Sequence, residues 1–459
     1  MSSMSNFPDK WDVKSLGEAC KTIKGKKPKN TGPASSERTV PYINIKAFES
    51  GRPQEFAAPG DYPICERDDV LIVWDGARAG LSGRAVPGYV GSTLAKVYSD
   101  AADNRYLFYF LQSQYGRINS RTKGVGIPHV DPTIFNNIPF PIAPLAQQRH
   151  IVAEIEKQFS RLDEAVANIK RVDANLKRYK AAVLKAALEG RLVETETDLA
   201  RREGRSYETG AQLLVRILEA RASQSQANAR HKKPVQVDIS NPKTLPEGWV
   251  WTSVDCVGDV LLGRQRAPQY LTGRYSRPYL RVANVKDSWI DFSDLEEMDF
   301  DEKHFPKYRL ESGDILISEG QSPELLGQSA IFKGFPKPLC FQKTLHRFRP
   351  IPGSVSPDFA QIVFRSHVQT GVFRKLGSIT TNIAHLTLEK FRAAPFPLPP
   401  LAEQHRIVME VERVLAVQKD LATEVHAHLK RTNRIRQCLL QRAFSLTPSS
   451  GLRLRGDNK

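Results

Sequence analysis

The sequence predicts an α+β fold in which two similar mixed bodies are separated by two long helices that pair as an antiparallel coiled coil. Three observations carry this prediction. A fourteen-residue segment occurs twice in the 459-residue chain, as PFPIAPLAQQRHIV at 139–152 and as PFPLPPLAEQHRIV at 395–408, with nine identical positions and no gap. A seven-residue apolar repeat follows each copy, and strand-like runs between Gly and Pro turns precede each copy. The chain is therefore built twice from one plan, which allows a pseudo-twofold axis.

The first body is expected to span residues 1–138 and to mix strands with helices. Strand-like runs occur at 42–45 (YINI) and 69–74 (DVLIVW), and a helical pattern occurs at 106–115. The start of this body matches the start of the second one. Three residues, Pro8, Trp11 and Gly25, recur as Pro246, Trp249 and Gly263 at an offset of 238. This offset differs from the 256 residues between the repeated segments, so the two bodies differ in length. The alternative to an internal repeat is that Pro and Gln recur at these positions by coincidence.

A first spacer region, 139–192, is expected to contain a long helix. Pro144 marks an extended approach, so the helix should begin near Leu145, and Gly190 is a natural left-handed cap for its end. Roughly 45 residues at about 1.5 Å each give a rod of about 65 to 70 Å. Apolar residues recur every seven positions and form the expected coiled-coil seam: Ile155, Leu162, Ile169, Leu176 and Val183.

A polar connector, 193–244, should follow, with one short helix around Leu213 and Leu218. The second body is then expected at 245–394, with strand-like runs at 279–282 (YLRV) and 313–318 (GDILIS).

The second spacer region, 395–447, should hold the second long helix, which begins near Leu401 after Pro400. Its seam is weaker but keeps the same register: Val411, Leu415, Val425, Leu429 and Leu439. An exposed rod of this length needs a partner, and the obvious partner for one helix is the other. Antiparallel pairing would place the two bodies at opposite ends. A flexible basic tail, 448–459, is expected to end the chain.

The composition favours an acidic polymer as partner. Lys and Arg exceed Asp and Glu by 17, so nucleic acid is favoured over an anionic membrane surface, with a ribosomal or solubility role as the alternative. There is no run of eighteen apolar residues and no signal-like start, so a soluble cytoplasmic protein is expected. The five cysteines include no C-x-x-C pair, which indicates neither a disulfide framework nor a zinc module, and they are expected to be buried apolar residues.

Together these features resemble the specificity (S) subunit of type I restriction-modification systems. The resemblance covers nearly the whole chain and rests on the P-x-P-x-x-P-L-A-x-Q lead-ins at 139–148 and 395–404, the helix end LKRYKAAVLKAALEGRL at 176–192 and the LPEGW start at 245–249. One departure is that Gln147 stands where the second lead-in has Glu403. Losing that carboxylate in the first helical turn is expected to weaken only a helix-dipole interaction, by a few tenths of a kcal/mol, roughly.

The resemblance implies two target recognition domains, two helical spacers, and a subunit that performs no chemistry itself. It further implies assembly on double-stranded DNA with two adenine-methylating modification subunits, which would hold S-adenosylmethionine, and with restriction subunits where these are present. This chain is expected to bind no cofactor and no metal.

The sequence contains none of the methyltransferase, phosphate-loop, nuclease or metalloprotease motifs that would indicate catalysis. Asn241-Pro242 is followed by Lys243 and not by the Pro-aromatic pair of an amino-methyltransferase, and GKKPKN at 25–30 is not a phosphate loop. No Glu-x-Lys triplet or H-E-x-x-H motif occurs. A DNA-modifying enzyme with unfamiliar motifs and a helical scaffold that binds only proteins are the alternatives.

DNA contacts are expected from three pairs of loops. The first pair is the basic loop at 21–30 and its counterpart after Gly263, which could neutralise phosphates, although a solvated charge run is the alternative. The candidates are Lys24, Lys26, Lys27 and Lys29, then Arg264, Gln265, Arg266, Arg274 and Arg277.

The second pair is WDGARAG at 74–80 and EGQSPELLGQS at 319–329. Arg78 suits guanine, whereas Gln321 and Gln328 suit adenine, so different half-sites are expected; turn formation is the alternative reading.

The third pair is TKGVGIPHV at 122–130 and SITTNIAHL at 378–386, in which the matching His129 and His385 are expected to be structural. Its candidates, together with two further basic residues, are Lys123, Thr380, Thr381, Asn382, Arg84 and Lys343.

Overall fold

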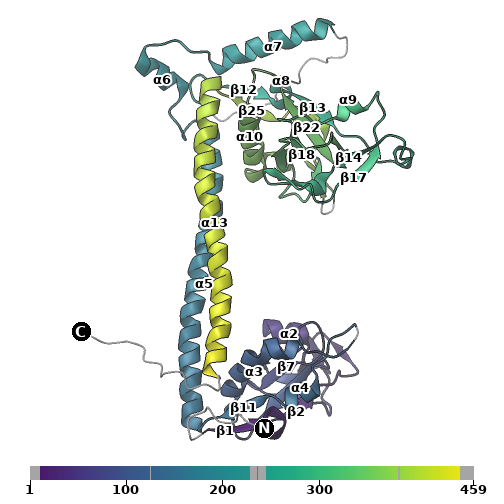
Figure 1. Cartoon of the computed structure of the whole chain (residues 1–459), viewed down its shortest axis with the longest axis vertical. Helices are drawn as coiled ribbons and strands as arrows, with labels where there is room; N and C mark the ends of the chain where they lie inside the picture. Colours follow the sequence, from purple (N-terminus) through teal and green to yellow (C-terminus); the bar gives the residue numbers. More distant parts are fainter. Residues whose placement is uncertain (1–10, 125, 228–234, 236–243, 381–382, 445–459) are drawn as a thin grey trace, which may run out of the picture. The chain divides into compact units, whose positions relative to one another are not determined.

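The computed structural model describes residues 11–124, 126–227, 235, 244–380 and 383–444 (Figure 1). The chain divides into two compact units. The first contains the residues up to 171 and those from 425 onward, and the second contains residues 172–424. Each unit therefore holds one mixed body and parts of both long helices. The expected tail at 448–459 lies outside the described residues.

The first unit is built on a four-stranded antiparallel sheet that α3 covers. The sheet order is β2-β10-β7-β8, made of β2 (Lys21–Lys24), β10 (Leu94–Tyr98), β7 (Val70–Val73) and β8 (Ser82–Arg84). The helices of this body are α1 (Leu16–Ala19), α2 (Ile45–Ser50), α3 (Asn104–Asn119) and α4 (Pro132–Asn136). Buried residues of α3, the sheet and both long helices form one core.

Two further sheets complete the first body. A five-stranded sheet has the order β3-β5-β4-β9-β6, made of β3 (Thr31–Gly32), β5 (Glu55–Ala57), β4 (Val40–Ile43), β9 (Gly88–Val90) and β6 (Ile64–Cys65). A two-stranded sheet joins the start of the body to the lead-in of the long helix, because β1 (Asp12–Ser15) pairs with β11 (Pro139–Ile142). The two ends of the first body are therefore held together.

The second unit repeats this plan. Its main sheet has the order β13-β22-β18-β20, made of β13 (Gly258–Leu262), β22 (Leu345–Pro350), β18 (Ile315–Ser318) and β20 (Ser329–Ile331). β12 (Val250–Ser253) pairs with β25 (Pro395–Leu398), as β1 does with β11. The helices of this body are α8 (Val254–Val257), α9 (Phe305–Tyr308), α10 (Pro357–Gln369), α11 (Val372–Leu376) and α12 (Leu388–Arg392).

The second body also carries short strands on long excursions of the chain. These are β14 (Ser276–Leu280), β17 (Glu296–Asp299) and β21 (Cys340–Phe341) in one sheet, β15 (Val285–Lys286) with β16 (Trp289–Ile290), and β19 (Gly320–Gln321), β24 (Ile383–His385) and β23 (Ser378–Thr380) in another, with 3₁₀ turns at Pro268–Tyr270 and Val282–Asn284. The α+β class and the internal repeat are thus confirmed.

The matching glycines have a physical cause. Gly25 follows β2 and Gly263 follows β13, the first strand of each main sheet. A Cβ on Gly25 would lie 2.3 Å from the carbonyl oxygens of Val90 and Gly91, and a Cβ on Gly263 would lie 2.2 Å from that of Gln342. Backbone crosses backbone at both places, so only glycine fits there.

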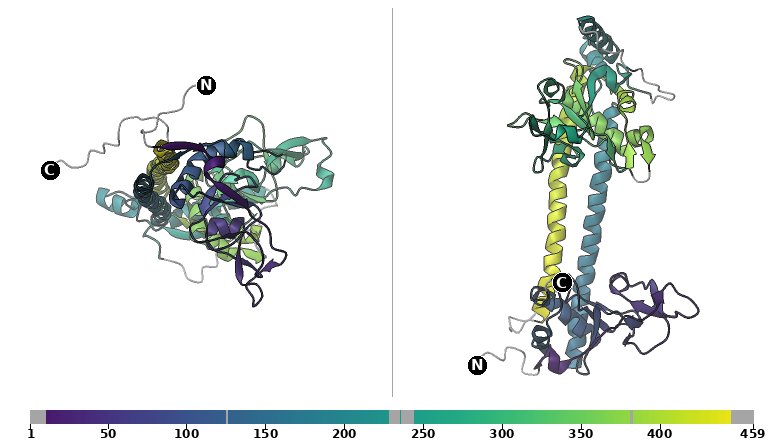
Figure 2. Two further views of the ribbon diagram at one scale, coloured as in Figure 1. Left: turned by 90° about the horizontal axis from the view of Figure 1, so that it is seen from below. Right: turned by 90° about the vertical axis from the view of Figure 1, so that its right-hand side faces the viewer.

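The two long helices begin at the predicted residues. α5 spans Leu145–Leu188 and α13 spans Leu401–Ala443, and they run side by side (Figure 1, Figure 2). Gly190 adopts φ 65°, and the Arg191 N–H donates to the Ala186 carbonyl at 2.9 Å, which closes α5 with a left-handed cap.

The helices pair antiparallel within each unit. In the first unit Asp163 forms an ion pair with Arg436, whose guanidinium also lies 4.6 Å from the Phe159 ring. In the second unit the Gln418 side chain donates to the Leu176 carbonyl at 3.2 Å. Later residues of α5 thus meet earlier residues of α13. All ten residues expected in the seam are buried or half-buried.

The connector contains two helices where one was expected. α7 (Gly210–Ala227) covers the expected position, and α6 (Glu196–Glu203) precedes it. α6 escaped prediction because its sequence, ETDLARRE, has no apolar periodicity. It is fixed by caps instead: the Thr195 hydroxyl accepts from the Asp198 N–H, and Gly204 closes the helix in the left-handed conformation.

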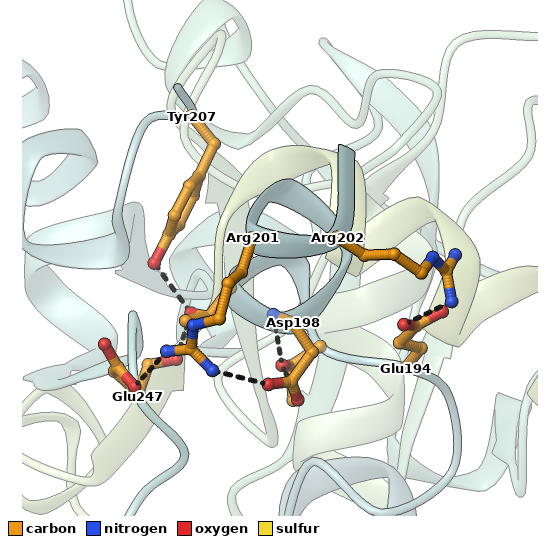
Figure 3. A network of polar contacts seen from close by, with 8 residues as sticks. Glu194, Asp198, Arg201, Arg202, Tyr207 and Glu247 are labelled. Carbon is orange, nitrogen blue, oxygen red and sulfur yellow. Dashed lines mark hydrogen bonds and ion pairs between the residues drawn. The ribbon is translucent and has the colours of Figure 1, made fainter. Parts of the chain in front are cut away.

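Ion pairs and hydrogen bonds attach α6 to the start of the second body (Figure 3). Arg201 bridges Asp198 at 3.2 Å and Glu247 at 3.1 Å, and Arg202 pairs with Glu194 at 2.7 Å. The hydroxyl groups of Thr197 and Tyr207 lie 2.6 Å apart. This network holds a helix that its own sequence only weakly favours.

The matching tryptophans explain the difference between the two lead-ins. Trp249 Nε1–H donates to Glu403 Oε1 at 3.0 Å, and the Glu196 N–H donates to Glu403 Oε2 at 2.9 Å. Glu403 is completely buried, and burial raises its pKa. In the first unit Trp11 Nε1–H donates to Gln147 at 2.6 Å. Residue 403 is therefore chiefly a buried acceptor, and the helix-dipole interpretation understated its role.

Replacement of Glu403 by Ala should destabilise the second unit by about 2–5 kcal/mol, since it strands two buried donors. The matched variant Gln147→Ala should cost about 0.5–1 kcal/mol, because the bond that it breaks is exposed. Urea unfolding followed by tryptophan fluorescence measures both losses. Equal losses in the two variants would contradict this account of the buried carboxylate.

Four of the five cysteines are buried as expected, whereas Cys438 on α13 is exposed. Burial raises the pKa of Cys20 and of Cys340 to about 12, so both thiols remain protonated and behave as apolar side chains.

None of the helices in the described part of the chain combines the length and apolar character needed to cross a bilayer.

Candidate nucleic-acid interface

In the first unit, the three candidate loops meet at Asp75. Lys24, at the end of β2, places its ammonium 3.0 Å from Asp75, and His129 Nδ1 lies 2.7 Å from the same carboxylate. Asp75 and His129 also form a backbone bridge, and Lys123 bridges His129 in turn. Stretches that were predicted separately from sequence therefore form one surface.

Glycines and backbone hydrogen bonds shape this loop cluster. Gly76 adopts φ 116° and its N–H donates to the Pro128 carbonyl at 2.8 Å, which joins the loop after β7 to the loop before α4. Gly80 adopts φ 94°, and a Cβ there would lie 2.7 Å from Ile118. Both positions need glycine, so the turn role of WDGARAG is real and does not exclude a contact role for its side chains.

The basic residues of this surface differ in how strongly they are neutralised. Arg78 pairs with Glu49 at 2.5 Å, Arg84 with Asp68 at 3.4 Å, and Lys123 with Asp131 at 3.0 Å. The hydrogen bond from Lys123 lowers the pKa of Asp131. The remaining three candidates are exposed and form no ion pair with any described residue: Lys26, Lys27 and Lys29. Their charges are the most available for phosphate.

The second unit joins its loops in a similar way. β19 pairs with β24, so Gly320 faces His385 and Gln321 faces Ala384. His385 Nδ1 lies 3.5 Å from the Glu319 carboxylate. In both units, a half-exposed histidine therefore meets an acidic residue just after the central strand. The histidines take part in joining the loops, although their apolar neighbours do not bury them.

The polar candidates of these loops are placed differently. Gln321 and Gln328 are half-buried at the ends of the excursion between β18 and β20. Thr380 ends β23, whereas Thr381 and Asn382 lie outside the described residues. Gln321 and Thr380 are thus the described polar candidates that lie in the three-stranded sheet.

Arg264 is mostly buried against aromatic rings. Its side chain is only 7% exposed, and its guanidinium lies 3.9 Å from the Tyr270 ring and 5.5 Å from the Phe300 ring. A contact between Arg264 and DNA stays a prediction, and its burial makes Arg264 less accessible than its neighbours. Tyr270 and Phe300 lie in segments that match no motif of the first half. The sequence around Arg264 therefore gave no sign that these rings would cover it.

The other candidates near Arg264 are more accessible. Gln265, Arg274 and Lys343 are exposed, and Arg266 lies 3.7 Å from Glu296. Arg277 is half-buried, stacked 3.8 Å from the Phe305 ring, which orients its planar group. Sequence reasoning missed Asp75 and Glu319, although each follows the central strand of its sheet, which is a usable signal. In the described part of the chain, no cluster of His, Cys, Asp or Glu could hold a metal ion.

Comparison with known proteins gives the family. The model of the type I restriction modification DNA specificity domain matches residues 8–177 and 256–431. The chain is 33% identical over 181 residues to the MjaVIII specificity subunit of Methanocaldococcus jannaschii, covering 39% of this chain and 42% of that relative. It is 22% identical over 422 residues to the EcoBI specificity subunit of Escherichia coli, covering 88% of this chain and 79% of that one.

A solved structure shares the fold. It comes from a study of complex assembly and conformational transition of the type I R-M system, and it matches with a TM-score of 0.60 at 19% identity, over 95% of this chain and 98% of the other. Alignment with the MjaVIII subunit spans less than half of that relative's length.

Proposed function

Since the chain belongs to the type I restriction modification DNA specificity family, we propose that it is the subunit that reads DNA for such a system. It recognises an asymmetric target of two half-sites in double-stranded DNA. Residues 1–138 read one half-site and residues 245–394 read the other. The chain leaves methylation and cleavage to its partners.

The observation that carries this proposal is the duplicated loop cluster with different side chains. In each unit, an acid and a histidine join loops that are far apart in the sequence. The first cluster displays exposed lysines and Arg78, whereas the second displays Gln321 and Gln328. Arg suits guanine and Gln suits adenine in the major groove. Equal frameworks with unequal side chains support a target whose halves differ.

The two long helices are proposed to fix the gap between the half-sites. They lie within the proposed spacer regions 139–192 and 395–447, and the proposed connector, 193–244, lies between these two regions in the sequence. Within each unit, their packing through the seam residues and a hydrogen bond such as that from Gln418 to Leu176 support a stiff element.

The partners are proposed to be two modification subunits, which hold S-adenosylmethionine, and restriction subunits where the system has them. Exposed apolar side chains on both helices of the second unit support binding of a protein partner, since water would otherwise surround them. These residues are Val172, Tyr179, Val417 and Leu421.

Nuclease protection of DNA by the full chain and its methyltransferase partners tests the function. We expect two short protected sequences separated by an unprotected gap, and adenine methylation only when the partners are present. A single uninterrupted protected stretch would contradict the bipartite reading. Methylation by the purified chain alone with S-adenosylmethionine would instead identify an enzyme.

Two substitutions should separate affinity from specificity. Lys27→Ala should weaken binding to all sequences and lower the slope of log affinity against log salt by about 1, because one phosphate contact is lost. Gln321→Ala should cost about 1–3 kcal/mol on the preferred base and relax the preference at one position. Binding measured on a library of single-base variants at several salt concentrations distinguishes these outcomes. Identical profiles for both variants would contradict the assignment.

A further inference from the structure

A basic cavity of about 500 Å³ lies in the second unit, behind the strand that leads to the first candidate loop. α7, α9, α12 and the paired strands β13 and β22 line it. Its basic residues are Arg221, Lys307, Arg347, Arg349 and Arg392, and its acidic residues are Asp255 and Asp259. Five positive side chains from four elements therefore converge on one opening.

Among the described residues, Arg347 forms a single ion pair, a long one to the mostly exposed Asp259. Only 5% of the residue is exposed, and its Nε has no hydrogen-bond partner among the described residues. One terminal nitrogen donates to the Lys307 carbonyl at 3.3 Å, and the other lies 3.5 Å from Asp259. Burial and the neighbouring Arg349 lower the pKa of Arg347. A buried guanidinium in this state is costly unless an anion joins it.

The other arginines of the cavity are satisfied. Arg392 forms a two-bond pair with Asp255 at 2.9 Å for each bond, and Arg349 forms another with Asp314 at 2.6 and 2.7 Å. Arg221 donates to the Asp255 carbonyl. Lys307 lines the cavity and is exposed; its ammonium lies 5.3 Å from the Tyr308 ring and forms no ion pair with a described residue. The surplus charge is thus that of Arg347 and Lys307.

The matching position of the first unit is neutralised. Lys96 on β10 occupies the place that Arg347 has on β22, and it pairs with Asp69 at 2.5 Å. The fold therefore does not require a basic residue with so weak a counter-ion at this position. Its presence in the second unit points to a ligand.

We propose that this cavity binds one backbone phosphate of the DNA that the second unit reads, an inference that rests on the proposed function. A phosphate group offers several oxygens to Arg347, whose fork of donors suits it, and to the ammonium of Lys307. Arg347 pairs in register with Leu261, and the exposed candidates Gln265 and Arg266 follow shortly after that strand. At about 3.3 Å per residue, Leu261 on the cavity wall is separated from them by about 13–17 Å of extended chain.

Asp259 competes with an incoming phosphate for Arg347. Its carboxylate is 63% exposed and lies near Arg347, so it supplies a weak counter-ion that an entering phosphate displaces. Because replacement of the buried Arg347 also threatens folding, exposed residues make the sharper test. Asp259→Asn removes the competing charge, Lys307→Ala removes a phosphate donor, and Lys303→Ala removes an exposed lysine outside the cavity as a matched control.

DNA binding by the full chain across salt concentrations is the first measurement. Lys307→Ala should lower the salt slope by about 0.9 and weaken binding about eightfold at 0.1 M salt relative to Lys303→Ala, the factor that one phosphate contact supplies. Asp259→Asn should bind more tightly than the wild type, a gain that a misfolded variant cannot produce. The proposal is overturned if both variants match Lys303→Ala while the wild type keeps a steep slope, an outcome that leaves the DNA-reading function intact. A flat wild-type slope would reject that function itself.

Thermal unfolding with inorganic pyrophosphate is the second measurement. Pyrophosphate should raise the Tm of the wild type, more strongly that of Asp259→Asn, and least that of Lys307→Ala. Stabilisation of this pattern without any change in the DNA salt slope would assign the cavity to a free phosphate compound and would overturn its assignment to DNA.

Discussion

Exchange of residues 245–394 for the corresponding segment of a relative with a different target should change one half-site and leave the other untouched. The exchanged segment carries the second loop cluster, including Gln321 and Gln328, and none of the first. Each mismatched base pair costs about 1–3 kcal/mol, so loss of three recognised pairs should weaken binding to the original target by at least about 100-fold. Sequencing of methylated adenines in a host that carries the chimera reads both halves of the new target at once.

The boundaries of this exchange follow from the fold. β12 lies inside the exchanged segment and pairs with β25 outside it, but the pairing uses backbone bonds and tolerates changed side chains. The donor segment must keep Trp249, which donates to Glu403 in the helix. A chimera with a donor of the same specificity is the control. A change in both half-sites, or in neither, would show that the bodies do not read independently.

Lengthening both long helices by one heptad should widen the gap between the half-sites and preserve their sequences. Seven residues add about 10.5 Å of helix, which corresponds to about three base pairs of B-form DNA. Insertion after Lys170 in α5 and after Glu424 in α13 places the added turns opposite each other, because the helices run antiparallel. The methylated target should then contain about three more unread positions.

Insertion in α5 alone is the matched control for this experiment. It shifts one half of the seam past the other and separates pairs such as Asp163 with Arg436 and Leu176 with Gln418. This variant should lose stability without gaining a defined new gap. An unchanged gap in the double insertion would show that the helices do not act as the spacer.

The helices and the repeat could be predicted because their signals are local or repeated. Pro144 and Pro400 exclude helix before Leu145 and Leu401, and both helices begin there. Gly190 closes α5 as its sequence suggests. The candidate loops could be named since matching residues follow matching glycines at Gly25 and Gly263.

The partners of those residues could not be predicted, because long-range contacts decide them. Arg264 looks like an exposed base contact in sequence, but Tyr270 and Phe300 enclose it. Arg347 lies in β22, and the sequence of this strand, LHRFRP, does not show which of its faces lines a cavity. α6 is stabilised by caps and ion pairs across the second unit, which a search for apolar periodicity misses.

The unequal partners of the two tryptophans have a consequence for how such genes exchange parts. The lead-in segments share nine of fourteen residues and offer natural sites for homologous crossover. A crossover that moved Glu into position 147 would place a carboxylate beside the exposed Trp11 Nε1–H, where water solvates the charge. One that moved Gln into position 403 would replace a buried acceptor with an amide facing the Glu196 N–H. Transfer of the second lead-in to the first position should therefore be tolerated better than the reverse transfer. Glu403 should be inherited together with the connector that carries Glu196.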